Sequence, residues 1–296
     1  MKKQTCINWI NISKKKMKIL VTGGCGFIGK ALTKRLLDNG YEVDIVDNFS
    51  IGKEAEIVEG ATFLGGDIRA MENIEDKNYD YIYHLAAFSR VEISYEHQNL
   101  TFSVNVEGTK KVLDYALRNN SKVIFASSSS IHHSISPYSS SKRMAEELCK
   151  FYRDGLNLNV TIVRLYNVYG PGELVDSHMA ALLGKWRKQL KNNEPLTIQQ
   201  LGIQQRAFTH IDDTIDGLIL LLNTNQKNLK GWEMGSDKTY SINDVYNMFQ
   251  QKFGNIKHKF IPSIGGNYKI GKRADDDVER LGWQPKDRLK EYIDSL

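Results

Sequence analysis

Lys18-Ile-Leu-Val-Thr-Gly-Gly-Cys-Gly-Phe-Ile-Gly29 is the stretch of this chain that decides its fold. It opens with a short apolar, β-rich run, which is typical of a strand buried in a parallel sheet. Gly23, Gly26 and Gly29 follow, and a helical pattern then runs to Gly40. Strand, glycine turn and helix in this order form a cradle for a pyrophosphate, because glycines allow close backbone approach and the helix N-terminus faces the phosphates.

Asp47 follows the next predicted strand, Glu42–Val46, and lies 18 residues beyond Gly29. A carboxylate at this place can hold the ribose hydroxyls of adenosine and would repel a 2′-phosphate. Without the glycine loop, Asp47 would be read as an ordinary turn residue at a strand end. With the loop upstream, the sequence predicts NAD rather than NADP as the cofactor.

The chain continues as an alternation of predicted strands and helices, which implies an α/β fold with a Rossmann-type, doubly wound parallel sheet. Further strands are expected at Ala61–Gly65, Tyr79–Leu85, Val123–Ala126, Val160–Leu165 and Leu196–Gln199, and helices at Val104–Asn119, 137–152, Ala180–Leu190, Asp212–Leu222 and Ser241–Phe253. We expect an NAD-binding domain over residues 17–166 and a smaller C-terminal α/β substrate domain over 167–296, interleaved with the first. Residues 1–16 are expected to be a disordered extension.

Tyr138 and Lys142 lie in the segment Ser136-Pro-Tyr-Ser-Ser-Ser-Lys142. Ser136 suits the N-cap of a helix and Pro137 its first position. The four-residue spacing then places Tyr138 and Lys142 on one helix face. A neighbouring cation favours phenolate over phenol, whose ordinary pKa is about 10. Such a pair can take a proton from an alcohol. The alternative is a solvated pair on the protein surface. The predicted glycine cradle at Gly23–Gly29 favours the first interpretation.

Composition and charge exclude several classes of protein. The chain of 296 residues has 41% hydrophobic and 25% charged residues, ordinary values for a globular protein, and no apolar run long enough for a membrane span. Three cysteines without metal or redox spacing favour a reducing compartment, and we expect the cytoplasm. The net charge of +5 comes partly from lysines near the N-terminus, and no aromatic platform or basic helix supports nucleic-acid binding. Adjacent His132 and His133 lack acidic or thiolate companions, so no metal site is expected.

Together these residues resemble the extended short-chain dehydrogenase/reductase family, in its nucleotide-sugar epimerase/dehydratase branch. The resemblance runs from Lys18 to about Pro285. Its motifs are Thr22–Gly29, Asp47-Asn48, Asp67-Ile-Arg69, His84-Leu-Ala-Ala87, Asn105-Val-Glu-Gly-Thr109, Ala126–Ser130, Tyr138–Lys142, Arg164-Leu-Tyr-Asn167, Tyr169-Gly-Pro171, Arg206-Ala-Phe-Thr-His-Ile-Asp-Asp213 and Leu281-Gly-Trp-Gln-Pro285.

The resemblance implies a role for each matching residue. Tyr138 would be the catalytic base and acid, Lys142 its partner on the nicotinamide ribose, and Ser128 the donor to the sugar 4-hydroxyl. NAD would be bound by Gly23, Gly26, Phe27, Ile28, Gly29, Asp47, Asn48, Asp67, Ile68, Leu85, Ala86, Ala87, Asn105, Tyr138 and Lys142. The nucleotide-sugar substrate would be bound by Ser128, Asn167, His178 and Arg206.

The neighbours of Ser128 decide which reaction of the family to expect. Resembling 4,6-dehydratases carry Asp-Glu directly after the catalytic threonine, and decarboxylases usually carry a glutamate two places on; here Ser129 and Ser130 follow. We therefore expect a 4-epimerase of a UDP-sugar (UDP-glucose, UDP-glucuronate or an N-acetyl relative) that acts through a 4-keto intermediate and keeps its NAD. The alternatives are an NDP-sugar 4,6-dehydratase, a 4-keto-sugar reductase and, in another class, a catalytically silent NAD-binding regulatory or scaffold protein.

The chain departs from the family pattern in two places. The segment Ile131–Pro137, which should line the substrate side, is shorter than in relatives. The second phosphate-binding arginine would fall near Gly265, with Arg273 or the lysines at 269 and 272 as substitutes. The resemblance also implies a homodimer, for which the helices at Val104–Asn119 and Ser141–Tyr152 are the candidates.

Overall fold

The computed structural model describes residues 16–51, 56–132, 135–224, 228–262 and 270–296. Residues 1–15 of the predicted extension therefore lie outside the described residues, as do His133, Gly265 and Lys269.

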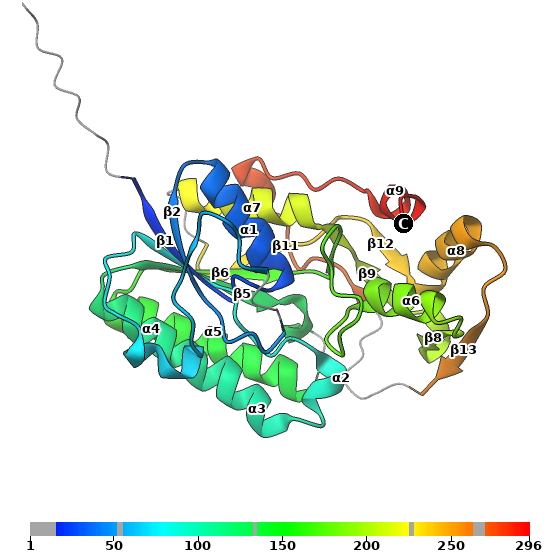
Figure 1. Cartoon of the computed structure of the whole chain (residues 1–296), viewed down its shortest axis with the longest axis horizontal. Coiled ribbons are helices and arrows are strands. Elements are labelled where there is room, and N and C mark those ends of the chain that lie inside the picture. Colours follow the sequence, from blue (N-terminus) through cyan, green and yellow to red (C-terminus); the bar gives the residue numbers. More distant parts are fainter. Residues whose placement is uncertain (1–15, 52–55, 133–134, 225–227, 263–269) are drawn as a thin grey trace, which may run out of the picture.

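A parallel sheet of seven strands forms the centre of the larger part of the molecule (Figure 1). Its strands are β1 (Lys18–Thr22), β2 (Glu42–Val46), β3 (Thr62–Phe63), β4 (Tyr81–His84), β5 (Lys122–Ser128), β6 (Val160–Leu165) and β11 (Trp232–Met234). Their spatial order is β3-β2-β1-β4-β5-β6-β11, and each neighbouring pair is parallel. The order reverses between β1 and β4, where a doubly wound sheet binds its ligand. The predicted α/β, Rossmann-type fold is confirmed.

Helices cover both faces of this sheet and enclose two apolar cores. On one face lie α4 (Thr109–Arg118) and α5 (Pro137–Leu156), which bury residues such as Val112, Leu113 and Ala145. On the other face lie α1 (Phe27–Asp38) and α7 (Ile211–Asn223), which pack against each other. Burial on both faces explains why β1 is apolar along almost its whole length.

The second half of the chain contributes to both parts of the molecule. Its strand β11 extends the large sheet beside β6, and α7 covers that sheet. A third core lies in the smaller part, around Trp186, Val245 and Phe249. The elements of this part are β7 (Val168–Tyr169), α6 (Leu182–Lys191), β8 (Leu196–Gln199), β9 (Gln205–Ala207), β10 (Thr209–His210), β12 (Thr239–Ser241), α8 (Ile242–Phe253), β13 (His258–Ile261), β14 (Ile270–Gly271) and α9 (Leu289–Asp294). The domain boundary at 166/167 stays a prediction.

Several predicted elements begin or end elsewhere than expected. Strand β5 continues through Ser127 and Ser128, because these residues pair with β6. The helix expected at Val104–Asn119 is divided into a π-helical segment, η3 (Ser103–Gly108), and α4. The remaining short helices are α2 (Val91–Ser94), α3 (Gln98–Phe102), η2 (Ile68–Asn73), η4 (Ser129–Ile131), η5 (Gln200–Gly202) and η6 (Asp277–Leu281).

His84 connects three of the elements that surround the sheet's switch point. Its Nδ1 lies 2.8 Å from the Thr22 hydroxyl oxygen and its Nε2 lies 3.0 Å from that of Thr109. Complete burial and, to a smaller extent, the charge of Lys142 lower the pKa of His84 to about 3. His84 is therefore a neutral structural group that holds β1, β4 and α4 together.

Candidate active site

A cavity of about 710 Å³ opens at the carboxyl ends of the parallel strands. Such a volume suits small-molecule and cofactor binding. Among the residues that line it are nearly all those predicted from the sequence: Gly23, Gly26, Phe27, Ile28, Gly29, Asp47, Asn48, Asp67, Ile68, Leu85, Ala86, Ala87, Ser128, Tyr138, Lys142, Asn167, His178 and Arg206. The tertiary fold thus brings residues from both halves of the chain to one place.

Asn105 is the exception, because it does not line this cavity. Its side-chain amide donates to Phe88 O at 3.0 Å and to Ser141 Oγ at 2.9 Å, and its Oδ1 accepts from Phe88 N at 2.8 Å. The side chain is buried and its hydrogen bonds are used within the protein. Asn105 joins the loop after β4 to helix α5, and a direct contact with the cofactor is not supported.

The glycine loop has the geometry of a phosphate cradle. Gly23 has a φ of +74°, and a Cβ on it would lie 2.8 Å from Ala86 N. A Cβ on Gly29 would lie 2.0 Å from Gly23 O, so a side chain there would break the turn. The loop leads into the N-terminus of α1, whose first turn contains no acidic residue. These features fit the pyrophosphate of a dinucleotide.

Two carboxylates lie beside this cradle, on the loops after β2 and β3. Asp47 accepts hydrogen bonds from the backbone N–H groups of Cys25 at 3.0 Å and of Phe49 at 2.8 Å, which fix its orientation. Asp67 accepts two hydrogen bonds from the Arg69 guanidinium and one from the Asn48 amide. The bond from Arg69 lowers the pKa of Asp67 to about 2. The Asp47 carboxylate is thus held in a fixed orientation at the cavity, as its predicted role on the adenosine ribose requires. The Asp67 carboxylate already accepts hydrogen bonds from Arg69 and Asn48.

Tyr138 lies in the first turn of α5, and the local sequence fixes where that helix begins. Ser136 accepts from the Ser139 N–H at 3.1 Å, while the Ser139 hydroxyl accepts from the Ser136 N–H at 2.9 Å. This reciprocal capping box places Pro137 at the first helical position, as predicted. The Tyr138 N–H donates to Ser94 Oγ at 3.2 Å, which connects the helix start to α2.

Lys142 is buried one turn further along α5. Its ammonium donates to Ala126 O at 2.7 Å and lies 4.6 Å from the centre of the Phe125 ring. Burial lowers the pKa of Lys142 to about 8. The side chain therefore holds a cation inside the protein, at the end of β5 and on the same helix as Tyr138.

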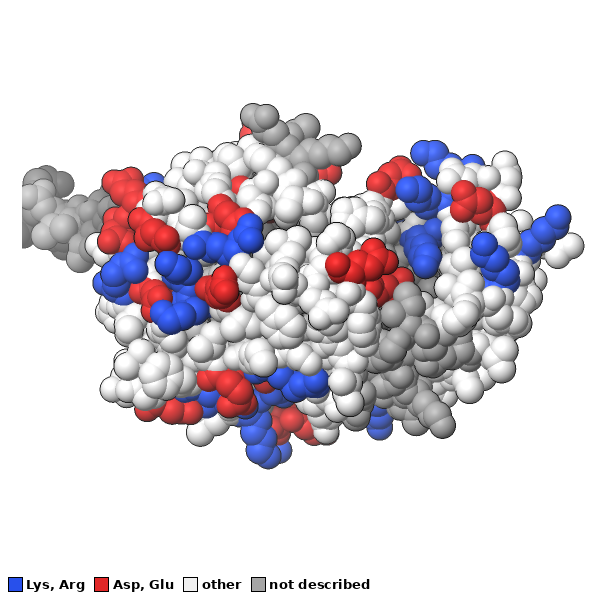
Figure 2. All heavy atoms as spheres, turned by 90° about the horizontal axis from the view of Figure 1, so that it is seen from below, with Lys and Arg blue, Asp and Glu red and all other residues white. Residues whose placement is uncertain are grey.

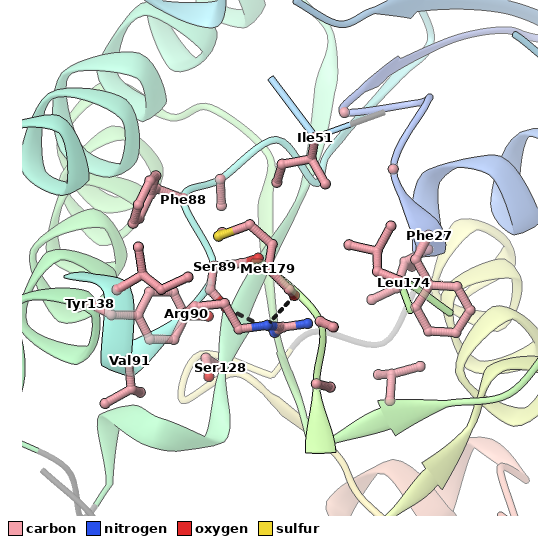
Figure 3. Close-up of a pocket in the computed structure, with 18 of the residues that line it drawn as sticks. Phe27, Ile51, Phe88, Ser89, Arg90, Val91, Ser128, Tyr138, Leu174 and Met179 are labelled. Atoms are coloured by element: carbon pink, nitrogen blue, oxygen red, sulfur yellow. Dashed lines mark hydrogen bonds between the residues drawn. The ribbon is translucent and has the colours of Figure 1, made fainter. Parts of the chain in front are cut away.

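Ser128 ends strand β5 and lies on the same side of the cavity as Tyr138 (Figure 3). Its Oγ accepts from Ser130 N at 3.2 Å and from Ser130 Oγ at 3.0 Å. Because both of these bonds are accepted, the hydroxyl proton of Ser128 can point to a ligand. A hydroxyl, a phenol and an ammonium thus converge at the end of β5, an arrangement suited to removing a proton from an alcohol.

Comparisons with known proteins agree with this geometry. The sequence profile of the NAD dependent epimerase/dehydratase family matches residues 19–235. The chain belongs to this family. We therefore assign NAD as the cofactor of the cavity described above, and the glycine cradle and Asp47 fit it.

Relatives within the epimerase/dehydratase family carry different activities in their names. The chain is 31% identical to a Methanocaldococcus jannaschii protein named "Putative UDP-glucose 4-epimerase", over 93% of this chain and 95% of that protein. It is 28% identical to UDP-glucuronic acid decarboxylase 1 of Xenopus tropicalis, over 95% of this chain and 71% of that protein. The crystal structure of UDP-glucuronic acid 4-epimerase from Bacillus cereus, in complex with UDP-glucuronic acid and NAD, superposes with a TM-score of 0.85 at 28% identity, covering 94% of this chain and 96% of that one.

The short segment before α5 is attached through His132 to a buried network of charged side chains. Glu233 on β11 accepts from Arg164 at 2.7 Å, from the Tyr166 hydroxyl at 2.6 Å and from His132 Nε2 at 2.9 Å. Arg164 also forms two hydrogen bonds with Glu146 on α5. His132 thus connects the segment to the sheet, and among the described residues no group of side chains could hold a metal ion.

Two cationic side chains that line the cavity were not predicted from the sequence. Arg90 follows the loop after β4, and Lys185 lies on α6. The suggested substitute Arg273 is wrong for this purpose, because it does not line the cavity and its guanidinium bonds Asp237 and Glu279. Arg90 lies only three residues beyond the His84–Ala87 motif, so its place in the sequence could have indicated a residue of the cavity. Lys185 lies in no motif, and nothing in the sequence indicated its place.

No described helix is long and apolar enough to cross a membrane.

Cys25 and Cys149 are buried free thiols, and burial together with the charge of Asp47 raises the pKa of Cys25 to about 11. A cytoplasmic location stays a prediction.

Proposed function

We propose that this protein is an NAD-dependent 4-epimerase of a UDP-sugar. The observation that carries the proposal is the convergence of Ser128, Tyr138 and Lys142 at one wall of a cavity whose other wall is the glycine cradle. NAD, held by the glycine cradle and Asp47, would supply reversible hydride transfer at C4 of the sugar. The protein's own groups must therefore bind the sugar, move one proton at O4 and allow both faces of C4 to be presented.

Each catalytic side chain has a distinct part in this proposal. Tyr138 takes the proton of the C4 hydroxyl when the sugar is oxidised and returns it when the 4-keto group is reduced. The Lys142 cation favours the phenolate form of Tyr138, which makes the proton transfer possible near neutral pH. Ser128 donates a hydrogen bond to O4, where negative charge develops during reduction.

Ser129 and Ser130 favour epimerisation over the other reactions of the family. Loss of water from C5 and C6 needs an acid and a base in addition to Tyr138. Ser130 offers a hydroxyl that is hydrogen-bonded to Ser128, and a serine hydroxyl is a poor substitute for a carboxyl group in either task. The intact catalytic set also argues against a silent scaffold. A 4-keto-sugar reductase is the second candidate within this fold.

Asn167, His178, Arg206 and Lys185 are the proposed contacts for the nucleotide diphosphate. All four line the cavity. The side-chain amide of Asn167 donates to Ala207 O and the Arg206 guanidinium donates to Gln205 O, both at 2.8 Å. The cations among them suit the charge of a diphosphate.

We also propose that the protein forms a homodimer through α4 and α5. Leu117, Met144 and Phe151 on these helices are exposed, Phe151 to 57% and Met144 to 51%. Figure 2 views the molecule from the side of α3, α4 and α5, and the middle of this face carries few charged side chains. An exposed apolar face of this kind is typical of an interaction surface.

The experiment that tests the proposed activity is an incubation of the NAD-loaded protein with a panel of UDP-sugars, followed by NMR of the anomeric protons. We expect a C4 epimer of at least one sugar to accumulate to equilibrium without added NADH. Release of CO₂ would instead identify a decarboxylase, a 4-keto-6-deoxy product a dehydratase, and stoichiometric consumption of NADH or NADPH a reductase.

The Tyr138→Phe variant supplies the matched control. We expect its kcat to fall by at least about 100-fold, because the general acid–base group is lost. NAD binding should persist, since the cradle and Asp47 are unchanged. Turnover at the rate of the unaltered protein would remove Tyr138 from the proposed mechanism.

A further inference from the structure

Arg90 places a guanidinium inside the cavity. Its Nε donates to Met179 O at 2.5 Å and its Nη1 donates to Ser89 O at 2.9 Å. Both acceptors are neutral backbone carbonyls, and these bonds use two of the five N–H donors of an arginine. The remaining donors are therefore available to a ligand in the cavity that Arg90 lines.

Arg90 lacks a carboxylate partner among the residues that the structure describes. The acids whose charges act on Arg90 are Glu92 and Glu173, and each forms an ion pair with another residue, Glu92 with Lys185 and Glu173 with Arg187. Burial lowers the pKa of Arg90, which means that the site disfavours an unpaired cation. The guanidinium nevertheless remains protonated at any physiological pH. A cation that is removed from water is stabilised by a neighbouring anion. An anionic group of the ligand can supply that partner.

The position of Arg90 indicates which part of the ligand this is. Figure 3 shows Arg90 extending into the cavity beside Tyr138, with Ser128 on the same side and Phe27 on the opposite side. Arg90 therefore lies next to the group that handles the proton of O4.

The structure of a hexopyranose limits the possible anions near O4. C5 is bonded to C4 and carries C6, whereas C1, which carries the diphosphate, lies across the ring from C4. C4 is also bonded to C3, so an anion beside O4 is a substituent at C6 or on O3. Among the UDP-sugars considered above, only the hexuronate carries a charge on the sugar, and that charge is its C6 carboxylate. The planar fork of a guanidinium matches the two oxygens of a carboxylate.

We propose that Arg90 binds the C6 carboxylate of a UDP-hexuronate and so makes the enzyme selective for uronates over neutral hexoses. This inference rests on the proposed C4 chemistry, because Tyr138 is used to place O4. Met179 and Ser89 orient the guanidinium through their carbonyls, and the hydroxyl of Ser128 remains for O4 itself.

The test compares the binding of UDP-glucuronate, UDP-glucose and UDP to NAD-loaded protein by calorimetry. The unaltered protein is expected to bind UDP-glucuronate more tightly than UDP-glucose. Arg90→Met should weaken UDP-glucuronate by at least about tenfold, the effect of losing a charge-assisted hydrogen bond, and leave UDP-glucose and UDP unchanged. Arg206→Met, an arginine at the diphosphate end, should weaken all three ligands alike.

Equal weakening of UDP-glucuronate and UDP-glucose by Arg90→Met would overturn the inference, because it is the result expected if Arg90 merely supports the segment around Met179. Equal affinity of the unaltered protein for both sugars would overturn it as well. If Arg90→Met does not fold, Arg90→Lys keeps the charge without the fork and should still weaken UDP-glucuronate more than UDP-glucose; equal weakening there also contradicts the role. Selective binding of the uronate without inversion at C4 would support Arg90 and refute the epimerase proposal, so the two are separable.

Discussion

At the scale of single residues, the proposed site contains a charged side chain, Lys142, in surroundings that disfavour its charge. Lys142 is buried, with a carbonyl and an aromatic ring as its contacts. Its ammonium is nevertheless the group that would favour the phenolate of Tyr138. A residue that is held in an unfavourable state by the fold is typical of a functional site.

Removing this cation should therefore stabilise the fold while it destroys activity. Burial lowers the pKa of Lys142 from 10.5 to about 8. Below pH 8 the buried charge therefore lowers the free energy of unfolding by a constant amount. This loss of stability shrinks between pH 8 and pH 10.5 and is absent at higher pH. At pH 7 we expect Lys142→Met to raise the free energy of unfolding by about 1–3 kcal/mol and to lower kcat at least about 100-fold. Urea denaturation at pH 7 and pH 10 measures the first effect, which should be smaller at pH 10. A variant less stable than the unaltered protein at pH 7 would contradict this account.

At the scale of elements, the start of α5 determines where Tyr138, the proposed catalytic residue, is placed. The capping box of Ser136 and Ser139 fixes the first turn, and that turn carries Tyr138. The network of Arg164, Glu146 and Glu233 ties the middle of the same helix to β6 and β11. A helix fixed at both places can hold a phenol in register with Ser128 on the neighbouring strand.

The capping box should consequently affect both stability and rate. We expect Ser136→Ala to lower the free energy of unfolding by about 1 kcal/mol and also to lower kcat, because Tyr138 lies two residues beyond the cap. Ser241→Ala removes an equivalent capping box at α8, away from Tyr138, and is the matched control. It should cost similar stability and leave kcat unchanged. Equal kcat values for the two variants would show that the cap does not position Tyr138.

At the scale of the whole molecule, the two faces of the sheet have different surroundings. Helices α1 and α7 pack against each other on one face, while α4 and α5 on the other present exposed apolar side chains. The cavity lies at the ends of the strands, where residues of the smaller part reach it. A dimer through α4 and α5 would thus leave the cavity accessible.

The dimer proposal predicts a change of mass when the apolar face is charged. Light scattering should give twice the chain mass of 33.8 kDa for the unaltered protein and the chain mass for Phe151→Glu combined with Met144→Glu. A buried, unpaired carboxylate is strongly unfavourable at such an interface. Phe253→Glu, on an exposed phenylalanine of α8, should remain dimeric. A monomeric unaltered protein would refute the proposal.

The sequence alone was enough to predict the fold and most of the cavity. Local patterns carried this information: a buried strand before Gly23, a glycine spacing that leaves no room for a side chain, and a capped helix that places Tyr138 and Lys142 on one face. These features depend on neighbours within a few residues, so they can be read without knowing the fold. They also indicate the family, which the comparisons confirm.

Tertiary structure decided what depends on residues distant in sequence. Asn105 matches a motif but bonds Phe88 and Ser141, and Arg90 matches none but lies beside Tyr138. His132 finds its partner Glu233 101 residues away. Burial, hydrogen-bond partners and the charge of a cavity arise only when strands from across the chain are brought side by side. For that reason the sequence by itself was enough to predict the family and the side chains of the proposed chemistry at C4, whereas Arg90, the residue proposed to select the sugar, became visible only in the folded molecule.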